Sequence, residues 1–228
     1  MTTWAYGVTT SPTREKTLLP QTLASLAAGG FDRPRVFVDG PPGTHTNLNL
    51  PVVYRSEQIR TYGNFYLALL ELMIREPTAD RYAIFQDDLV TYRNLRAYLD
   101  TVPDPPRGYW NLYTFPHNLR HCNGHVGWSH SDQMGKGAVA LVFPRDAART
   151  LATQHHMISK PEDPKRGWKT LDGCIITAMK AMGYKEYIHN PSLVQHTGDE
   201  SSIGNKGHLK ADSFRGEEFD ARELISKQ

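Results

Sequence analysis

The sequence predicts an α/β fold with a mostly parallel central sheet flanked by helices. Short apolar runs rich in β-branched and aromatic residues alternate with segments of helical periodicity through residues 1–100, an order typical of parallel sheets. Three of these runs end in hydroxyl or acidic residues, at Thr9-Thr10-Ser11, Asp39 and Asp87-Asp88. Because parallel strands end at the same rim of a sheet, we expect these side chains to share one ligand-binding edge.

The expected elements follow from periodicity and from start and stop signals. Strands are predicted over residues 4–10, 35–39, 52–54, 82–88, 110–115, 138–143, 184–189 and 192–195, where β-branched and aromatic residues gather. Helices are predicted to begin at Pro20, Gly63-Asn64, Asn94, Pro144 and Asp172. Residues 154–171 are expected to form a flexible lid, and the chain from Asp199 to be partly ordered over the site and frayed at its end.

Composition is that of a compact globular protein. Hydrophobic residues make up 39% and charged residues 22% of the 228 residues, which suits one substantial domain and argues against a disordered chain. No apolar run is long enough to span a membrane, and no signal-peptide pattern is visible. Cys122 and Cys174 stand in unrelated contexts, so a cytoplasmic location is predicted, in the host if the protein is viral. The net charge of +2 argues against a polyanionic partner as the primary role, and no G-x-G-x-x-G or Walker loop occurs.

Asp87 and Asp88 follow the apolar residues of a predicted strand directly. Carboxylates at the carboxyl end of a buried strand suit Mg²⁺ or Mn²⁺, and through the cation a diphosphate. The alternative is that both acids cap or solvate the turn into the next helix. These two residues alone leave both interpretations open.

A histidine-rich loop over residues 117–130 holds His117, His121, His125 and His130, with Cys122 among them. Such a cluster invites a zinc site. Its spacing matches no structural zinc module, however, and no acid or second cysteine lies close by in the sequence. A mobile loop that faces an acceptor is the favoured interpretation. The basic run over residues 160–169 is either a solvated loop or a contact for an anionic substrate.

The order of these features resembles that of GT-A glycosyltransferases, single-domain enzymes that use nucleotide sugars. The matching pieces, spread over residues 4–208, are Thr9-Thr-Ser-Pro-Thr-Arg14, Phe37-Val-Asp39, Gly63-Asn64, Gln86-Asp-Asp88, Asp172 and Val194-Gln-His196. Residues 190–204 look particularly like inverting N-acetylglucosaminyltransferases and related bacterial or phage enzymes. The chain departs from the family in having Gln-Asp-Asp where Asp-x-Asp is usual, although variants with two terminal acids occur, in which the last acid binds the metal.

The resemblance implies a role for each matching residue. Asp88 would bind Mn²⁺ or Mg²⁺, His196 would complete the metal shell, and Asp87 would lie near the ribose or the sugar. Nucleotide-sugar contacts would come from Thr9, Ser11, Arg14, Asp39, Gly63, Asn64 and Lys206, with Asp39 on the base. Asp172 would be the general base for the acceptor hydroxyl, which implies inversion. Plain structural roles remain open for three of these positions: helix capping by Asp172, a satisfied ring at His196 and an ordinary helix start at Gly63-Asn64.

The implied function is transfer of a sugar from a nucleotide sugar, a UDP-sugar by resemblance, to an acceptor hydroxyl. One domain over residues 1–228 is expected, with a nucleotide-binding half at 1–100, an acceptor-binding half at 101–210 and a tail at 211–228. The acceptor could be a hydroxymethylated pyrimidine in phage DNA, a glycan, a lipid or a protein. A non-catalytic module that binds nucleotide sugars is the alternative from another functional class.

Overall fold

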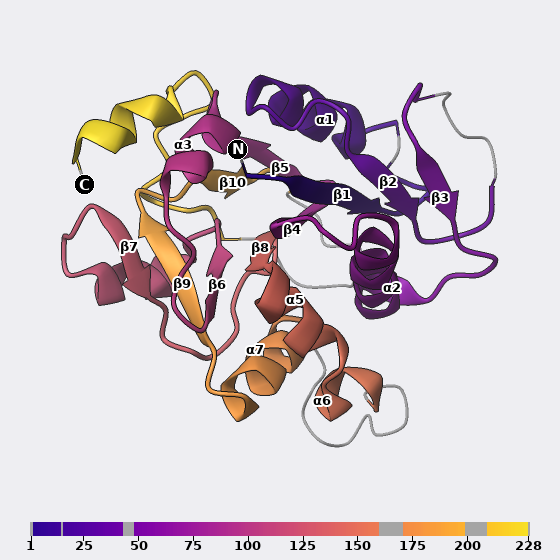
Figure 1. The fold of residues 1–228 in the computed structure, drawn as a ribbon. Coiled ribbons are helices and arrows are strands. Elements are labelled where there is room, and N and C mark those ends of the chain that lie inside the picture. The colour runs from indigo at the N-terminus through magenta and orange to yellow at the C-terminus, as the bar shows by residue number, and fades with distance from the viewer. Residues whose placement is uncertain (1, 15, 43–47, 160–170, 199–208, 228) are drawn as a thin grey trace.

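The computed structural model describes residues 2–14, 16–42, 48–159, 171–198 and 209–227 (Figure 1). The strands are β1 (Trp4–Thr10), β2 (Arg35–Val38), β3 (Val52–Tyr54), β4 (Arg81–Gln86), β5 (Leu89–Thr91), β6 (Gly108–Asn111), β7 (Gly127–His130), β8 (Ala140–Pro144), β9 (Lys185–Asn190) and β10 (Val194–His196). The helices are α1 (Leu18–Ala28), α2 (Arg60–Arg75), α3 (Leu95–Thr101), α4 (Pro116–Leu119), α5 (Arg145–Ala152), α6 (His155–Ile158) and α7 (Leu171–Ala181). The 3-10 helices among the described residues are η1 (Arg120–Cys122) and η3 (Ala221–Lys227).

Among the described residues, eight strands form one mixed sheet in the order β3-β2-β1-β4-β8-β6-β9-β7. The strands β3, β2, β1 and β4 are all parallel. β8 runs antiparallel to both β4 and β6, β6 is parallel to β9, and β7 is antiparallel to β9. The predicted α/β class is confirmed, and the antiparallel pairings enter in the second half of the chain.

Helices cover both faces of this sheet. α1, α3 and η3 lie on one face, and α2, α5 and α7 on the other (Figure 1). Within β4, Ala83 and Phe85 pack into the first core while Tyr82 and Ile84 pack into the second, as the alternation of a strand requires. A strand buried on both faces has no polar side, so its polar residues come where it ends. In the part of the chain that the structure describes, no helix combines the length and apolarity that a membrane crossing needs.

A small second sheet brings the C-terminal part of the chain to the end of β4. β10 pairs antiparallel with β5, and His196 is aligned with Leu89, the residue that follows Asp88. The backbone N–H of Thr197 then donates to the carbonyl oxygen of Asp88 at 2.8 Å. Strand pairing therefore places His196 beside a turn more than a hundred residues earlier in the chain.

The predicted start of α2 at Gly63-Asn64 is wrong. The helix begins at Arg60, and the carboxylate of Asp39, at the end of β2, accepts the backbone N–H of Ile59 at 2.7 Å. A distant side chain thus satisfies a donor at the helix entrance, where the local sequence supplies no capping residue.

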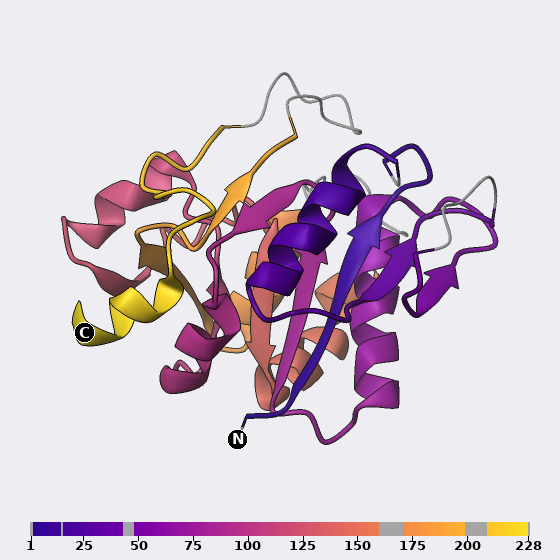
Figure 2. The ribbon, with the colours of Figure 1, turned by 90° about the horizontal axis from the view of Figure 1, so that it is seen from above.

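The sequence predicts that the chain from Asp199 is partly ordered over the site and frayed at its end. Residues 199–208 lie outside the described residues, and residues 209–227 are packed against the fold. Tyr92 stacks on Phe214, with ring centroids 4.8 Å apart, and meets Phe219 edge-on at 4.9 Å. Ala221 and Leu224 are buried, and the segment lies beside α3 in both views (Figures 1 and 2). The predicted lid falls partly on residues 160–170, which lie outside the described residues, and α6 occupies 155–158.

His189 in β9 joins the sheet to α3. Its Nε2 lies 2.7 Å from the hydroxyl of Tyr98, and its Nδ1 lies 2.7 Å from the carbonyl oxygen of Pro191. A carbonyl can only accept, so Nδ1 carries the proton and Nε2 accepts from the tyrosine in a neutral ring. Burial is the main cause that lowers the pKa of His189 to about 4.

This buried ring should make stability fall as the pH drops from about 6.5 to about 4, because in that window the unfolded chain binds a proton that the folded chain excludes. The full effect is about 3 kcal/mol. His189→Gln removes the titrating group, so urea unfolding across this pH range should show a shallower slope. His155→Gln, at an exposed position, is the matched control. Equal slopes for wild type and His189→Gln would contradict the assignment.

Candidate functional site

Asp87 and Asp88 form the turn between β4 and β5, and both are buried, with 3% and 1% of their surface exposed. The turn is held from α1, where the hydroxyl of Thr22 lies 2.8 Å from the carbonyl oxygen of Asp87 and 2.9 Å from that of Leu89. The same hydroxyl accepts the N–H of Leu89 at 3.1 Å. The strand predicted over residues 82–88 ends at Gln86, and both carboxylates lie in a hydrogen-bonded turn at the carboxyl rim of the sheet.

Arg14, in the segment after β1, bridges the two acids. Its Nη1 donates to Asp87 Oδ1 at 2.9 Å and to Asp88 Oδ2 at 2.6 Å. Thr10, the last residue of β1, donates to Asp87 Oδ2 at 2.5 Å. Both oxygens of Asp87 are therefore engaged by the end of β1 and the residues that follow it.

Asp88 has a different surrounding. His196 Nε2 lies 3.3 Å from Asp88 Oδ2, and Asp88 Oδ1 is buried without a hydrogen-bond partner among the described residues. Gly198 passes so close that a Cβ there would lie 3.1 Å from Asp88 Oδ2. A buried carboxylate oxygen that lacks a donor, next to an imidazole, fits a divalent cation. The imidazole favours a transition metal such as Mn²⁺ over Mg²⁺.

The environment pushes the two acids in opposite directions. Burial, followed by the charge of Asp88, raises the pKa of Asp87. For Asp88 burial also acts upwards, but the hydrogen bond and charge of His196, together with Arg14, hold its pKa below the usual value. Asp88 is thus the carboxylate kept ionised, which is the state a metal ligand needs.

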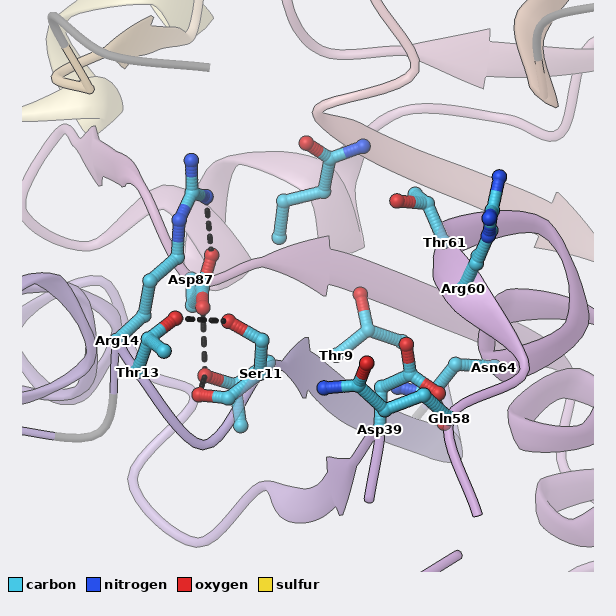
Figure 3. Close-up of a pocket in the computed structure, with 12 residues that line it drawn as sticks. Thr9, Ser11, Thr13, Arg14, Asp39, Gln58, Arg60, Thr61, Asn64 and Asp87 are labelled. Atoms are coloured by element: carbon cyan, nitrogen blue, oxygen red, sulfur yellow. Dashed lines mark hydrogen bonds and ion pairs between the residues drawn. The ribbon is translucent and has the colours of Figure 1, made fainter. Parts of the chain in front are cut away.

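A polar cavity of about 550 Å³ opens beside this corner. It is lined by Thr9, Thr10, Ser11, Thr13, Arg14, Asp39, Gln58, Arg60, Thr61, Asn64, Gln86 and Asp87. Figure 3 shows Arg14 and Asp87 on one side of the cavity and Arg60 and Thr61 on the other. The rim expected from the polar strand ends therefore forms one continuous surface.

The predicted nucleotide contacts at the strand ends lie in this cavity but engage differently. Asp39 uses Oδ1 for the N–H of Ile59, and its Oδ2 accepts no hydrogen bond from the described residues. Ser11 and Thr13 share a hydroxyl contact of 3.1 Å. Thr9 directs its hydroxyl to the carbonyl oxygen of Phe85 at 3.3 Å. Asp39 and Ser11 thus keep polar atoms that could bind a ligand, whereas the hydroxyl of Thr9 is hydrogen-bonded to the neighbouring strand β4.

Gly63 and Asn64, which the resemblance implies as nucleotide-sugar contacts, do not open the helix, because α2 begins at Arg60. Asn64 is 1% exposed. Its Nδ2 donates to the carbonyl oxygen of Phe37 at 2.9 Å, and its Oδ1 accepts from Arg55 Nε at 2.9 Å. Both ends of the amide are used to join α2 to β2 and to Arg55, and Asn64 also lines the cavity.

Sequence reasoning missed the residues at the true start of α2. Gln58, Arg60 and Thr61 line the cavity, and Arg60 has a left-handed backbone with φ of 62°. Strain of this kind at a non-glycine residue gathers at functional sites. Locating the helix start three residues earlier would have found them, and no local capping signal marks it. Thr10 was also missed as a partner of Asp87, although it stands in the polar run Thr9-Thr10-Ser11.

Asp172 is the second residue of α7 and reaches the same rim through the loop before β8. Its Oδ2 accepts the N–H of Gly137 at 2.6 Å and that of Ala138 at 3.4 Å. Gln86 Nε2 in turn donates to the carbonyl oxygen of Ala138 at 2.8 Å. The Asp172 carboxylate therefore binds the loop before β8 and does not cap its own helix. Its Oδ1 accepts no hydrogen bond from the described residues. Lys206 and the basic run over residues 160–169 lie outside the described residues.

Comparison with solved structures relates the fold of this chain to a known type. The chain superposes on the crystal structure of GalNAc-T7 with UDP, GalNAc and Mn²⁺ with a TM-score of 0.62 and 10% sequence identity, covering 87% of this chain and 44% of that one. It thus spans less than half the length of that protein. A197 from STIV superposes with a TM-score of 0.45 at 13% identity, covering 87% of each chain, a similarity too low to support an assignment. The sequence matches no protein-family model and no curated protein.

At 10% identity the first superposition shows the fold alone. The expectation of a GT-A glycosyltransferase-like fold is confirmed. The narrower resemblance to inverting N-acetylglucosaminyltransferases stays a prediction.

Arg14→Met should destabilise the protein by about 3 kcal/mol, because it leaves two adjacent buried carboxylates without the cation between them. Chemical denaturation at neutral pH measures the loss. Adding Asp87→Asn to Arg14→Met should recover much of it by removing one of the two charges. Arg149→Met, at an exposed position on α5, is the control. Wild-type stability in Arg14→Met would show that the guanidinium does not hold the acids together.

Proposed function

We propose that this protein is a glycosyltransferase that moves a sugar from a nucleotide sugar, most simply a UDP-sugar, to an acceptor hydroxyl with inversion. The observation that carries the proposal is the corner where Asp88, His196 and Arg14 meet beside the polar cavity. The likeness in fold to a protein crystallised with UDP, GalNAc and Mn²⁺ supports the same classes of ligand. One domain would then carry both the donor and the acceptor half.

Asp88 and His196 would hold the cation, since the carboxylate is kept ionised and has one buried oxygen to offer. When bound, Mn²⁺ supplies Lewis-acid stabilisation of the charge that develops on the leaving diphosphate. Arg14 stands within reach of the same place and adds a guanidinium suited to phosphate oxygens. Lys206 stays a predicted contact of this kind.

Donor binding would use the polar groups along the cavity. Asp39 offers Oδ2 to the base, Ser11 offers a hydroxyl, and Arg60 adds a second cation on the far side from Arg14. Asp87 has both oxygens engaged by Arg14 and Thr10. We therefore propose that Asp87, close to the ribose and the sugar, positions Arg14 and does not itself bind the donor.

Asp172 would act as the general base. The N–H groups of Gly137 and Ala138 hold one oxygen of its carboxylate, which fixes the orientation of the other. An acceptor hydroxyl placed at Oδ1 would lose its proton there as its oxygen attacks the anomeric carbon. The bond to the nucleotide breaks on the opposite side, which gives inversion in a single step.

Chelation tests the metal corner. Nucleotide release from a panel of nucleotide sugars should stop in EDTA and return with Mn²⁺, and Asp88→Asn should lower the rate by about 100- to 1000-fold, as loss of a preorganised electrostatic group does. Glu57→Gln, at an exposed position before α2, should keep wild-type activity. Activity and nucleotide affinity that are both indifferent to EDTA would remove Asp88 and His196 from their proposed roles together.

Asp172→Asn tests the base. Transfer should fall by about 10²- to 10⁴-fold, the usual contribution of a positioned base, while donor affinity stays near wild type. An amide oxygen can still accept from Gly137, so the loop should keep its place. Asp146→Asn, in the first turn of α5 and exposed, is the matched control.

Near-normal transfer by Asp172→Asn would rule out its catalytic role. Nucleotide binding without turnover of any donor, in water or with any acceptor, would instead favour a binding module. The acceptor screen should include glycans, lipids, proteins and duplex DNA with hydroxymethylated pyrimidines.

A further inference from the structure

The histidine-rich loop holds a second group of metal-binding side chains, separate from the corner at Asp88. His117 in α4 and His121 in η1 are four residues apart on one continuous helical segment. This spacing puts both imidazoles on the same side of the segment, and their ring centroids lie 6.3 Å apart. Both rings are exposed.

An acid just beyond the histidine-rich loop, two residues after His130, joins them. Asp132 follows β7, and one ligand atom from each of His117, His121 and Asp132 lies within 4.8 Å of the other two. His117 Nε2 is 3.9 Å from Asp132 Oδ2. The expectation that no acid lies near the histidines is therefore wrong, because the turn after β7 folds back onto the helical segment.

The position of Asp132 is built into the fold. Its backbone N–H donates to Asn118 Oδ1 at 3.1 Å, and Asn118 is fully buried between the two histidines in sequence. Its own Oδ1 accepts the N–H of Met134 at 2.9 Å. These bonds anchor the carboxylate next to the helical segment that carries the imidazoles. They do not use Oδ2, which lies on the side of His117.

Lys136 supplies the cation that contacts Asp132 Oδ2 in this structure. An incoming cation would therefore compete with this ammonium for the same carboxylate oxygen. The ammonium stands on a flexible side chain that is 30% exposed. It can move into solvent when another cation takes the oxygen.

Two imidazoles and one carboxylate form a ligand set typical of Zn²⁺, with the fourth position open to water. Tetrahedral ligands at Zn²⁺ distances lie about 3.4 Å apart, so the three groups must close by about an ångström. Rotation of two exposed histidine side chains can supply that movement. Mg²⁺, which prefers oxygen ligands, should bind here poorly.

We propose that His117, His121 and Asp132 form a Zn²⁺ site that is independent of the proposed donor-metal corner. His125 and His130 are not part of it. His117 also lines a cavity of about 570 Å³ together with Phe115, Pro116, Leu119, Arg120, Leu209 and Asp212. A bound cation would place a positive charge and an open coordination position at the edge of that cavity.

Titration of the full chain with Zn²⁺ in excess Mg²⁺ tests the proposal, since Mg²⁺ competes at an oxygen-rich site and poorly at imidazoles. The expected result is one tight Zn²⁺ per chain, and Co²⁺ in its place should give the strong visible absorption of four-coordinate geometry. His121→Ala should weaken binding at least about 100-fold, because loss of a group that merely orients a ligand already costs about 10- to 100-fold.

Three further variants separate this site from loose binding by surface histidines. His125→Ala, in the same loop, should bind Zn²⁺ as the wild type does. Asp132→Asn keeps the bond from Met134 and should weaken binding, while Lys136→Met removes the competing ammonium and should strengthen it. Equal effects of His121→Ala and His125→Ala, or no effect of Asp132→Asn, would overturn the proposal. None of these positions belongs to the buried core, and Asn is isosteric with Asp at position 132. Circular dichroism can therefore check that each variant folds.

Discussion

Two adjacent carboxylates buried at the end of a central strand are the constraint on which the rest of this structure depends. A buried charge is costly unless it is paired and hydrogen-bonded, and here two like charges share one turn. The guanidinium of Arg14 reaches both, Thr10 completes Asp87, and His196 completes one oxygen of Asp88. The segment after β1, the turn after β4 and the end of β10 must therefore meet at a single point.

That meeting explains features which are otherwise unconnected. The small sheet of β5 and β10 exists beside the main sheet and delivers His196 to Asp88. Gly198 follows because a side chain there would press on the same carboxylate. Burial also strengthens every electrostatic interaction in the corner, because few water molecules screen the charges. The arrangement that costs folding energy is thus the one to which we assign the donor metal.

The two cation sites proposed for this protein have one feature in common. At each site a positively charged side chain of this protein forms an ion pair with the carboxylate: Arg14 pairs with Asp88, and Lys136 pairs with Asp132. Such a cation keeps the carboxylate ionised and the local structure in place without a metal. It also sets the affinity, because an incoming ion must displace or tolerate that charge. The two sites differ in their ligands. The corner at Asp88 offers a carboxylate and one imidazole, whereas the site at Asp132 offers a carboxylate and two imidazoles, and this difference favours Mn²⁺ at the first and Zn²⁺ at the second.

The sequence by itself determined the α/β class, most strand positions and the polar rim, because each depends on local periodicity and on the change from apolar to polar residues where a buried strand ends. It could not tell that Thr10 rather than Thr9 would reach Asp87, since this follows from which way adjacent strand residues point. The start of α2 at Arg60 was also hidden, because its entrance is satisfied by Asp39 from another strand.

Tertiary structure alone decided which distant side chains meet. It brought His196 to Asp88, turned the Asp172 carboxylate onto the N–H of Gly137, and set Asp132 against His117. These contacts arise from strand pairing and loop packing between segments that share no local pattern. Their formation depends on the energy of the whole fold, and a single sequence window does not contain that information.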